Sequence, residues 1–112
     1  MNYTKTIKKL QTAINLQGQK LLYCTSEFYS KDLKRPVIMY YIKNAVFIDD
    51  SVSNEVLFKS ASQIRVVFFL RDLLECLNVG LHIDDATACA IDKQKTYITK
   101  RDVIRNKEES IT

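Results

Sequence analysis

The only histidine of the chain, His82, stands in the segment HIDD together with Asp84 and Asp85. An imidazole beside two carboxylates could hold a divalent metal ion, and a histidine oriented by a carboxylate could activate a serine. The spacing matches no recognised closed metal site, and no serine lies in a Gly-x-Ser-x-Gly turn. We therefore expect a solvated loop here, with no catalytic, metal-binding or cofactor-binding residue.

Cysteines and carboxylate pairs also lack the spacing that catalysis needs. Cys24, Cys76 and Cys89 form no CxxC pair, so a zinc ribbon or a thioredoxin-like motif is not indicated. The adjacent acidic residues stand in predicted turns or in the C-terminal tail, where no cleft would separate their pKa values. Only two glycines occur, which leaves no loop to cradle a phosphate. We expect a protein that is not an enzyme.

The cysteine usage also bears on location. Three cysteines are an odd, widely spaced set, which suits a reducing compartment better than a secreted disulfide framework. The opening MNYTKTIKKL has no apolar core of a signal peptide. The longest uncharged apolar run, residues 66–70, ends at Arg71 and is too short to span a membrane. We expect a cytoplasmic protein.

Aromatic and basic residues occur together on the predicted strands and the first predicted hairpin. Residues 1–48 hold seven lysines and one arginine against one glutamate and one aspartate, a net charge of +6. Tyrosines near such charges can stack on bases while the cations hold phosphates, and tyrosine also anchors protein interfaces. The candidates of this kind are Tyr29, Lys34, Arg35, Tyr40 and Tyr41.

The periodicity that would position these residues predicts two helices around three strands. Apolar residues at helical spacing predict a helix over 4–17, followed by a stop at Gly18. Strand-forming residues predict strands over 19–29, 37–48 and 55–59, with polar loops at 30–36 and 49–54. The simplest packing of this order is an α+β domain over residues 1–80: a three-stranded antiparallel sheet with two helices on one face.

The rest of the chain, residues 81–112, we expect to be a partly ordered C-terminal extension. Residues 96–99 suit a short strand, and Thr99 could cap a short helix that follows. The sheet face without helices is then either open or covered by this extension.

The segment from Ser60 to Leu77 is apolar on nearly every side of a predicted helix. A surface helix needs only about half of these apolar residues for one stripe. The helix over 61–77 is therefore either wrapped by the fold or buried on its far side by a partner. Phe68 and Phe69 would lie at that contact in a homodimer.

Two resemblances bear on function. The α-β-β-β-α order resembles the double-stranded RNA-binding domain, although FKSASQIR offers only Lys59 and Arg65 where that family has a lysine cluster. The opening MNYTKTIKKLQTAINLQGQKLLY, the segment LFKSASQIRVVFFLRDLLECL and the Lys/Asn/Ile-rich composition are similar to small proteins of Firmicutes phages and mobile elements. That class includes anti-CRISPR inhibitors. The resemblance implies inhibition of a host defence nuclease.

Three hypotheses follow. The leading one is a non-enzymatic phage or mobile-element protein that binds and inhibits a host nuclease such as a CRISPR effector. The alternative is a nucleic-acid-binding module that uses a basic, tyrosine-rich sheet and hairpin, and the third is a self-assembling regulatory protein. The acidic turn residues Asp49 and Asp50 join the partner-binding candidates, because they could reach a basic site on a nuclease.

Overall fold

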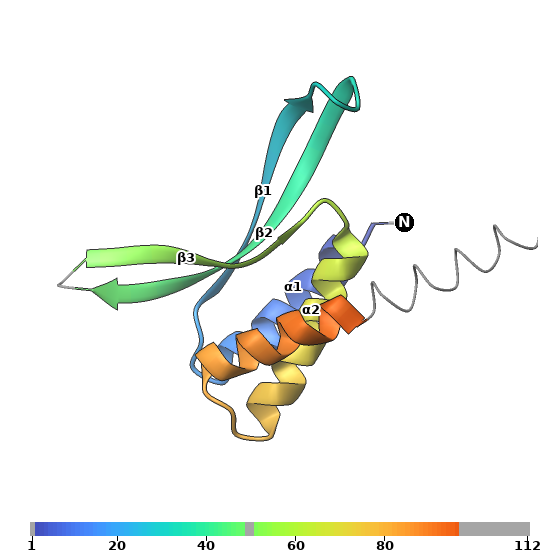
Figure 1. The fold of residues 1–112 in the computed structure, drawn as a ribbon. Helices are drawn as coiled ribbons and strands as arrows, with labels where there is room; N and C mark the ends of the chain where they lie inside the picture. Colours follow the sequence, from blue (N-terminus) through green and yellow to red (C-terminus); the bar gives the residue numbers. More distant parts are fainter. Residues whose placement is uncertain (1, 49–50, 97–112) are drawn as a thin grey trace, which may run out of the picture.

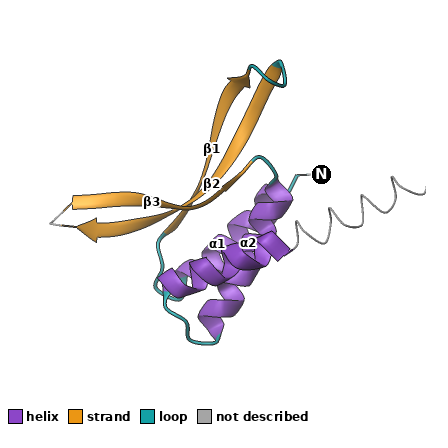
Figure 2. Cartoon of the chain, in the orientation of Figure 1, coloured by secondary structure: helices purple, strands orange, loops and turns teal. Residues whose placement is uncertain are grey.

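The computed structural model describes residues 2–48 and 51–96 of the chain. The elements follow in the order α1 (Thr4–Asn15), β1 (Leu21–Ser30), β2 (Arg35–Ile48), β3 (Ser51–Ser60) and α2 (Gln63–Asn78). A third helix, described over residues 83–96, comes after them. The strands form one antiparallel sheet in the order β1-β2-β3, so the expected α+β class is confirmed (Figure 2).

The central strand β2 is longer than the stretch that both neighbours cover. β1 pairs with it from Leu21–Asn44 to Ser30–Arg35, and β3 pairs from Tyr40–Ser60 to Ile48–Ser51. The sheet is therefore three strands wide only at residues 40–44 of β2. Beyond this centre the sheet continues as two separate hairpins, which diverge as arms in Figure 1. A register shift at Ile42–Lys43, typical of a β-bulge, lies where the arms part.

The third strand begins earlier than its sequence predicts. Residues 51–54 were expected in a turn because serine and asparagine favour turns, but they extend β3 along β2. Residues 49 and 50, the rest of that predicted turn, lie outside the described residues. Backbone hydrogen bonds to β2 hold this segment as a strand, although its side chains are exposed on both faces.

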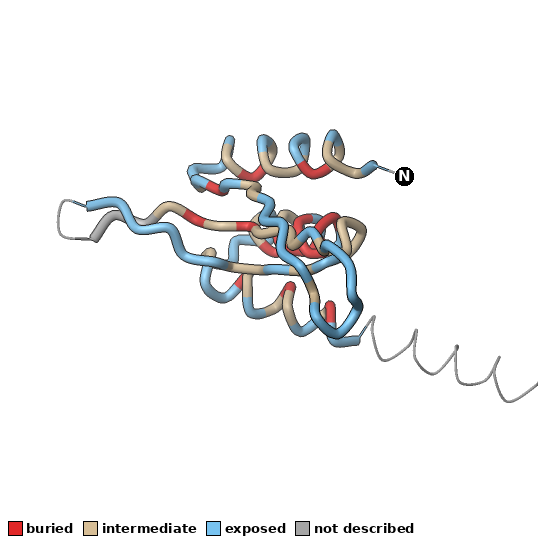
Figure 3. Tube along the Cα trace, turned by 90° about the horizontal axis from the view of Figure 1, so that it is seen from above, coloured by how far each residue is buried: buried red, intermediate tan, exposed pale blue. Residues whose placement is uncertain are grey.

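The apolar helix α2 is wrapped by the rest of the fold. Its buried side chains point to several sides, and they are Val66, Val67, Phe69, Leu70, Asp72, Leu73 and Cys76. α1 contributes the fully buried Ile7 and Ile14, and the sheet contributes Leu21 and Ile42. The sequence left open whether the fold or a partner protein covers this helix. Packing within the chain covers most of it (Figure 3).

The third helix was not predicted by the sequence. It contributes Ala86 and Ala90, both with no exposed area, to the core that α2 fills. His82 precedes the helix, and its Nδ1 accepts a hydrogen bond from the Asp84 N–H at 3.4 Å. The HIDD segment therefore begins a helix, where carboxylates interact favourably with the helix dipole. Thr96, the first residue of the strand predicted at 96–99, is helical; residues 97–112, with the helix predicted after Thr99, lie outside the described residues.

Candidate functional site

The two faces of the sheet differ in what covers them. Alternation along β1 and β2 places Leu21, Tyr23 and Ile42 on the face that packs against the helices. The opposite face, which we call the open face, carries the alternate residues of all three strands. Around the centre of the sheet and along the first hairpin its members are Leu22, Cys24, Ser26, Phe28, Ser30, Arg35, Val37, Met39, Tyr41, Lys43, Val56 and Lys59.

The open face exposes more apolar area than a solvated sheet face requires. Leu22 is 43% exposed, and Phe28 and Val56 are each 46% exposed. Val37, Met39 and Tyr41 lie between them and are half-buried. A contiguous apolar surface of this kind marks an interaction site more often than isolated exposed residues do.

Positive charge accompanies this apolar area. Lys43 lies on the central strand between Leu22 and Val56, and its ammonium is 5.7 Å from the centroid of the Tyr41 ring, within the range of a cation–π contact. Lys59 pairs with Tyr41 across the strands, and Arg35 stands at the far end of the open face. None of the open-face residues is acidic. A complementary surface would therefore combine apolar and acidic residues.

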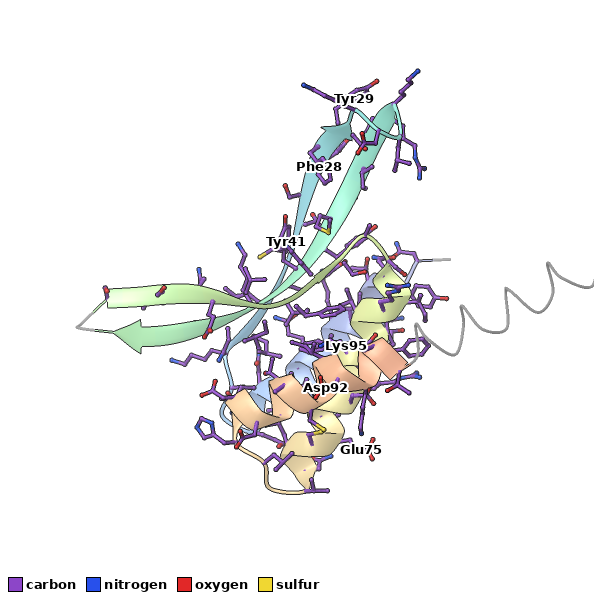
Figure 4. All side chains as sticks on the ribbon, in the orientation of Figure 1. Phe28, Tyr29, Tyr41, Glu75, Asp92 and Lys95 are labelled. Atoms are coloured by element: carbon purple, nitrogen blue, oxygen red, sulfur yellow. The ribbon has the colours of Figure 1, made fainter. Side chains whose placement is uncertain are left out.

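The tip of the β1–β2 hairpin carries a second cationic group. Residues 31–34 form the turn, and the Ser30 hydroxyl accepts a hydrogen bond from the Leu33 N–H at 3.2 Å. Lys34 adopts a left-handed conformation with φ of 55°, and Tyr29 beside the turn is 64% exposed. Figure 4 shows Phe28 and Tyr29 near this tip, far from the helices.

The structure brings together some of the predicted site residues and separates others. Tyr29, Lys34 and Arg35 share the hairpin tip, and Tyr41 lies on the open face. Tyr40 lies on the helix-covered face, where its ring stacks on Tyr23 with centroids 6.3 Å apart.

The remaining candidates lie elsewhere. Phe69 is in the core, so its side chain has no surface to offer a partner, whereas Phe68 is 38% exposed on α2. Asp49 and Asp50 lie outside the described residues.

The aliphatic part of the open face was not predicted from the sequence. Leu22, Val37, Met39 and Val56 were not among the candidates, although the sequence of 37–48 showed that both faces of that strand are largely apolar. An apolar side chain on the second face of a three-stranded antiparallel sheet is the signal that could have identified them.

A polar cavity of about 530 Å³ lies on the other side of the first hairpin, between the sheet and the start of α1. Gln63 holds this region together: its Oε1 accepts the Tyr3 N–H at 3.2 Å, and its Nε2 donates to Thr4 Oγ1 at 3.1 Å and to the Tyr23 hydroxyl at 3.2 Å. These contacts join α1, α2 and β1, so they serve the fold.

Two cysteines meet across the helices. Burial raises the pKa of the Cys76 thiol, and a hydrogen bond with Cys89 raises it further. All three cysteines are free. A thiol held in its neutral form is a poor nucleophile. Within residues 2–48 and 51–96, no three His, Cys, Asp or Glu side chains gather in a way that could hold a metal ion.

Comparison with protein-family models, curated proteins and solved structures finds no match to this chain. Among the described helices, none combines the length and the apolar character that crossing a membrane requires. The candidate site therefore stands on its own geometry.

Proposed function

We propose that this chain is a non-enzymatic binding protein whose open face docks onto a partner protein. The observation that carries the proposal is the exposed apolar area of the open face, where Leu22, Phe28 and Val56 are uncovered, on a sheet whose other face packs against the helices at Leu21, Tyr23 and Ile42. Burying this area would supply the hydrophobic driving force, at roughly 25 cal/mol per Å² before the costs of association.

The charged residues of the open face indicate the kind of partner that it fits. Arg35 and Lys59 lie beside the apolar residues and Lys43 lies between Leu22 and Val56, so a partner surface that combines apolar and acidic residues fits best. Within the class that the sequence resembles, the partner would be a host defence nuclease such as a CRISPR effector. Docking would then inhibit cleavage by pinning a nuclease domain, because a basic surface is a poor mimic of DNA.

The test uses the purified full chain with a panel of purified CRISPR effector nucleases. We expect inhibition of DNA cleavage and a stable complex with at least one effector. The double variant Leu22→Glu/Phe28→Glu should abolish both effects, because two buried carboxylates would face the apolar contact. Leu16→Glu is the matched control, since Leu16 is 83% exposed at the end of α1, away from the open face.

Two outcomes would count against the proposal. Full inhibition by the folded double variant would show that the open face is not the contact surface. Absence of binding and inhibition across the panel would remove defence nucleases as partners. Circular dichroism of each variant confirms that the fold is kept.

A second candidate function, nucleic-acid binding, is favoured by the hairpin tip. A two-stranded ribbon fits the major groove of DNA, and Lys31, Lys34 and Arg35 extend from this tip beside the exposed Tyr29. Binding should weaken steeply with salt, and Lys34→Gln/Arg35→Gln should reduce the salt slope by about 2. Lys5→Gln/Lys9→Gln, on exposed positions of α1, is the control. Salt-insensitive or undetectable binding would contradict this function.

A further inference from the structure

A groove runs between β3 and the third helix, on the side of the sheet edge where Ile91 approaches the strand. It consists of two adjoining cavities, of about 460 Å³ and about 260 Å³. Both cavities are lined by Phe58, Lys59 and Ile91, so they form one continuous depression. Tyr41 lines only the larger cavity and Lys95 only the smaller one; both residues are labelled in Figure 4.

The two ends of the groove differ in chemistry. The larger cavity is walled mainly by apolar and aromatic side chains, with Tyr41, Val56 and Leu57 added to the shared residues. The smaller cavity adds Ser60, Arg65, Gln94 and Lys95. Together with Lys59, three cationic side chains therefore converge on the smaller cavity, and no acidic residue is among its described lining residues.

A buried hydrogen-bond donor also lines the smaller cavity. Gln94 is only 5% exposed, and its Nε2 has no hydrogen-bond partner in the part of the chain that the structure describes. Buried amide groups are almost always paired, and an orphan donor costs stability. The nitrogen itself has almost no accessible surface, so it lies behind the wall of the cavity and does not face a ligand there.

The groove thus offers donors and positive charge at one end and an apolar wall at the other. We propose that it is a binding site for a small organic phosphate, with the phosphate between Lys59 and Arg65 and the apolar body against Tyr41 and Leu57. A phosphate fits better than a carboxylate, because it carries up to two negative charges and more acceptor oxygens to meet three cations. The planar guanidinium of Arg65 suits bidentate contact with two of those oxygens.

This site shares Tyr41, Val56 and Lys59 with the open face, so a protein docked on that face would cover part of the groove. The site itself does not require a docked protein. Asp92 lies 3.8 Å from Lys95, and both side chains are largely exposed. Lys95 can therefore turn between this carboxylate and a bound phosphate, while Lys59 and Arg65 supply the other two charges.

The test is an NMR titration of the full, isotope-labelled chain with phenyl phosphate as the probe. We expect saturable shifts of the backbone amides of Lys59, Arg65 and Gln94. Inorganic phosphate, which lacks the apolar body, should bind about tenfold more weakly, and benzoate should also bind more weakly than phenyl phosphate. Shifts confined to the hairpin tip, or equal affinity for phenyl phosphate and inorganic phosphate, would overturn the proposal.

Variants separate binding from folding. Arg65→Gln should weaken phenyl phosphate binding about tenfold, as loss of a charge-assisted hydrogen bond predicts; the exposed Lys59→Gln serves if Arg65→Gln does not fold. Gln94→Leu should raise the melting temperature of the free protein, because it removes the orphan donor, and should leave the affinity nearly unchanged. Lys9→Gln, on α1, should also leave the affinity unchanged. Unchanged affinity in both Arg65→Gln and Lys59→Gln would contradict the assignment.

Discussion

The ring of Phe58, near the end of β3, lies parallel to the ring of Phe69 on α2. Their centroids are 4.6 Å apart and their planes differ by 9°. This pair joins the sheet to the central helix, and Phe69 has no exposed area. The neighbouring Phe68, which the sequence offered as an equal candidate for a partner contact, faces away and is 38% exposed.

The two phenylalanines should respond differently to truncation. Phe69→Ala should lower the free energy of unfolding by about 3–5 kcal/mol, because it empties a core site and removes the stack on Phe58. Phe68→Ala should cost about 1 kcal/mol or less, as expected for a partly exposed position. Urea denaturation followed by circular dichroism measures both values. Similar losses for the two variants would contradict the assignment of Phe69 to the core.

The side chain of Gln63 should contribute more to the stability of the fold than its partial exposure suggests. It makes three hydrogen bonds, to Tyr3, Thr4 and Tyr23, and so ties three elements together. Gln63→Ala should destabilise the fold by about 1–3 kcal/mol, because partners in a half-buried region lose their bonds. Tyr23→Phe, which removes one of these bonds and keeps the ring, should cost about 1 kcal/mol. Denaturation of both variants against the parent chain is the measurement, and a negligible cost for Gln63→Ala would show that water replaces these bonds.

The hairpin turn contains a backbone conformation that lysine adopts at a cost. Lys34 has φ of 55°, and glycine reaches that region without a clash of Cβ. Lys34→Gly should therefore raise the melting temperature and increase the free energy of unfolding by as much as about 1 kcal/mol. Lys31→Gly, in the same turn but without a positive φ, should lower stability slightly through added freedom of the unfolded chain. A destabilised Lys34→Gly protein would argue that the turn has another conformation.

Stability should fall in alkaline solution. The pKa of Cys76 in the folded protein is raised above its ordinary value of 9.0, chiefly by burial. Folding therefore favours the protonated thiol of Cys76. The contribution of this thiol to the free energy of unfolding is complete below about pH 9 and is lost as the pH rises through the raised pKa. The pKa of Lys93 is also raised, mainly by the charge of Glu75. Deprotonation of Lys93 therefore also lowers stability, at still higher pH.

Unfolding free energies measured from pH 7 to pH 10.5 check this expectation. The parent protein should lose stability above pH 9, and Cys76→Ala should show a flatter profile from a lower starting value. The same burial predicts slow alkylation of Cys76 in the folded chain at pH 8 and rapid alkylation in denaturant. Equal slopes for the two proteins would mean that another group controls the alkaline loss.

Strong local patterns account for the parts of the fold that the sequence predicted. The stripe of Ile7 and Ile14, the aromatic and β-branched run of β2 and the apolar density of α2 identify these elements without tertiary information. The number of strands, their antiparallel order and the placement of α1 and α2 follow from them. The sequence also suggested a sheet face open to solvent or covered by the extension, and the described part of the extension contributes only Ile91 at its border.

The third helix escaped prediction because its core-facing residues are small. Ala86 and Ala90 stand four apart and let the helix approach α2 closely, but alanine adds little to a hydrophobic pattern. The acidic pair after His82 also favoured a loop, while in the fold it occupies a helix start. The groove was hidden for a related reason: it joins Lys59, Arg65 and Gln94 from three elements, and no spacing along the chain relates such residues.

The uneven pairing of β2 has a consequence for how this protein tolerates change in length. Because only residues 40–44 of β2 are paired on both sides, each arm beyond them consists of β2 and one neighbouring strand. Removing or adding two residues on both strands of an arm would keep the alternation of side chains between the faces and leave the central packing untouched. The reach of each arm is therefore adjustable independently of the folded body, and insertions or deletions in related chains should collect at the two hairpin ends.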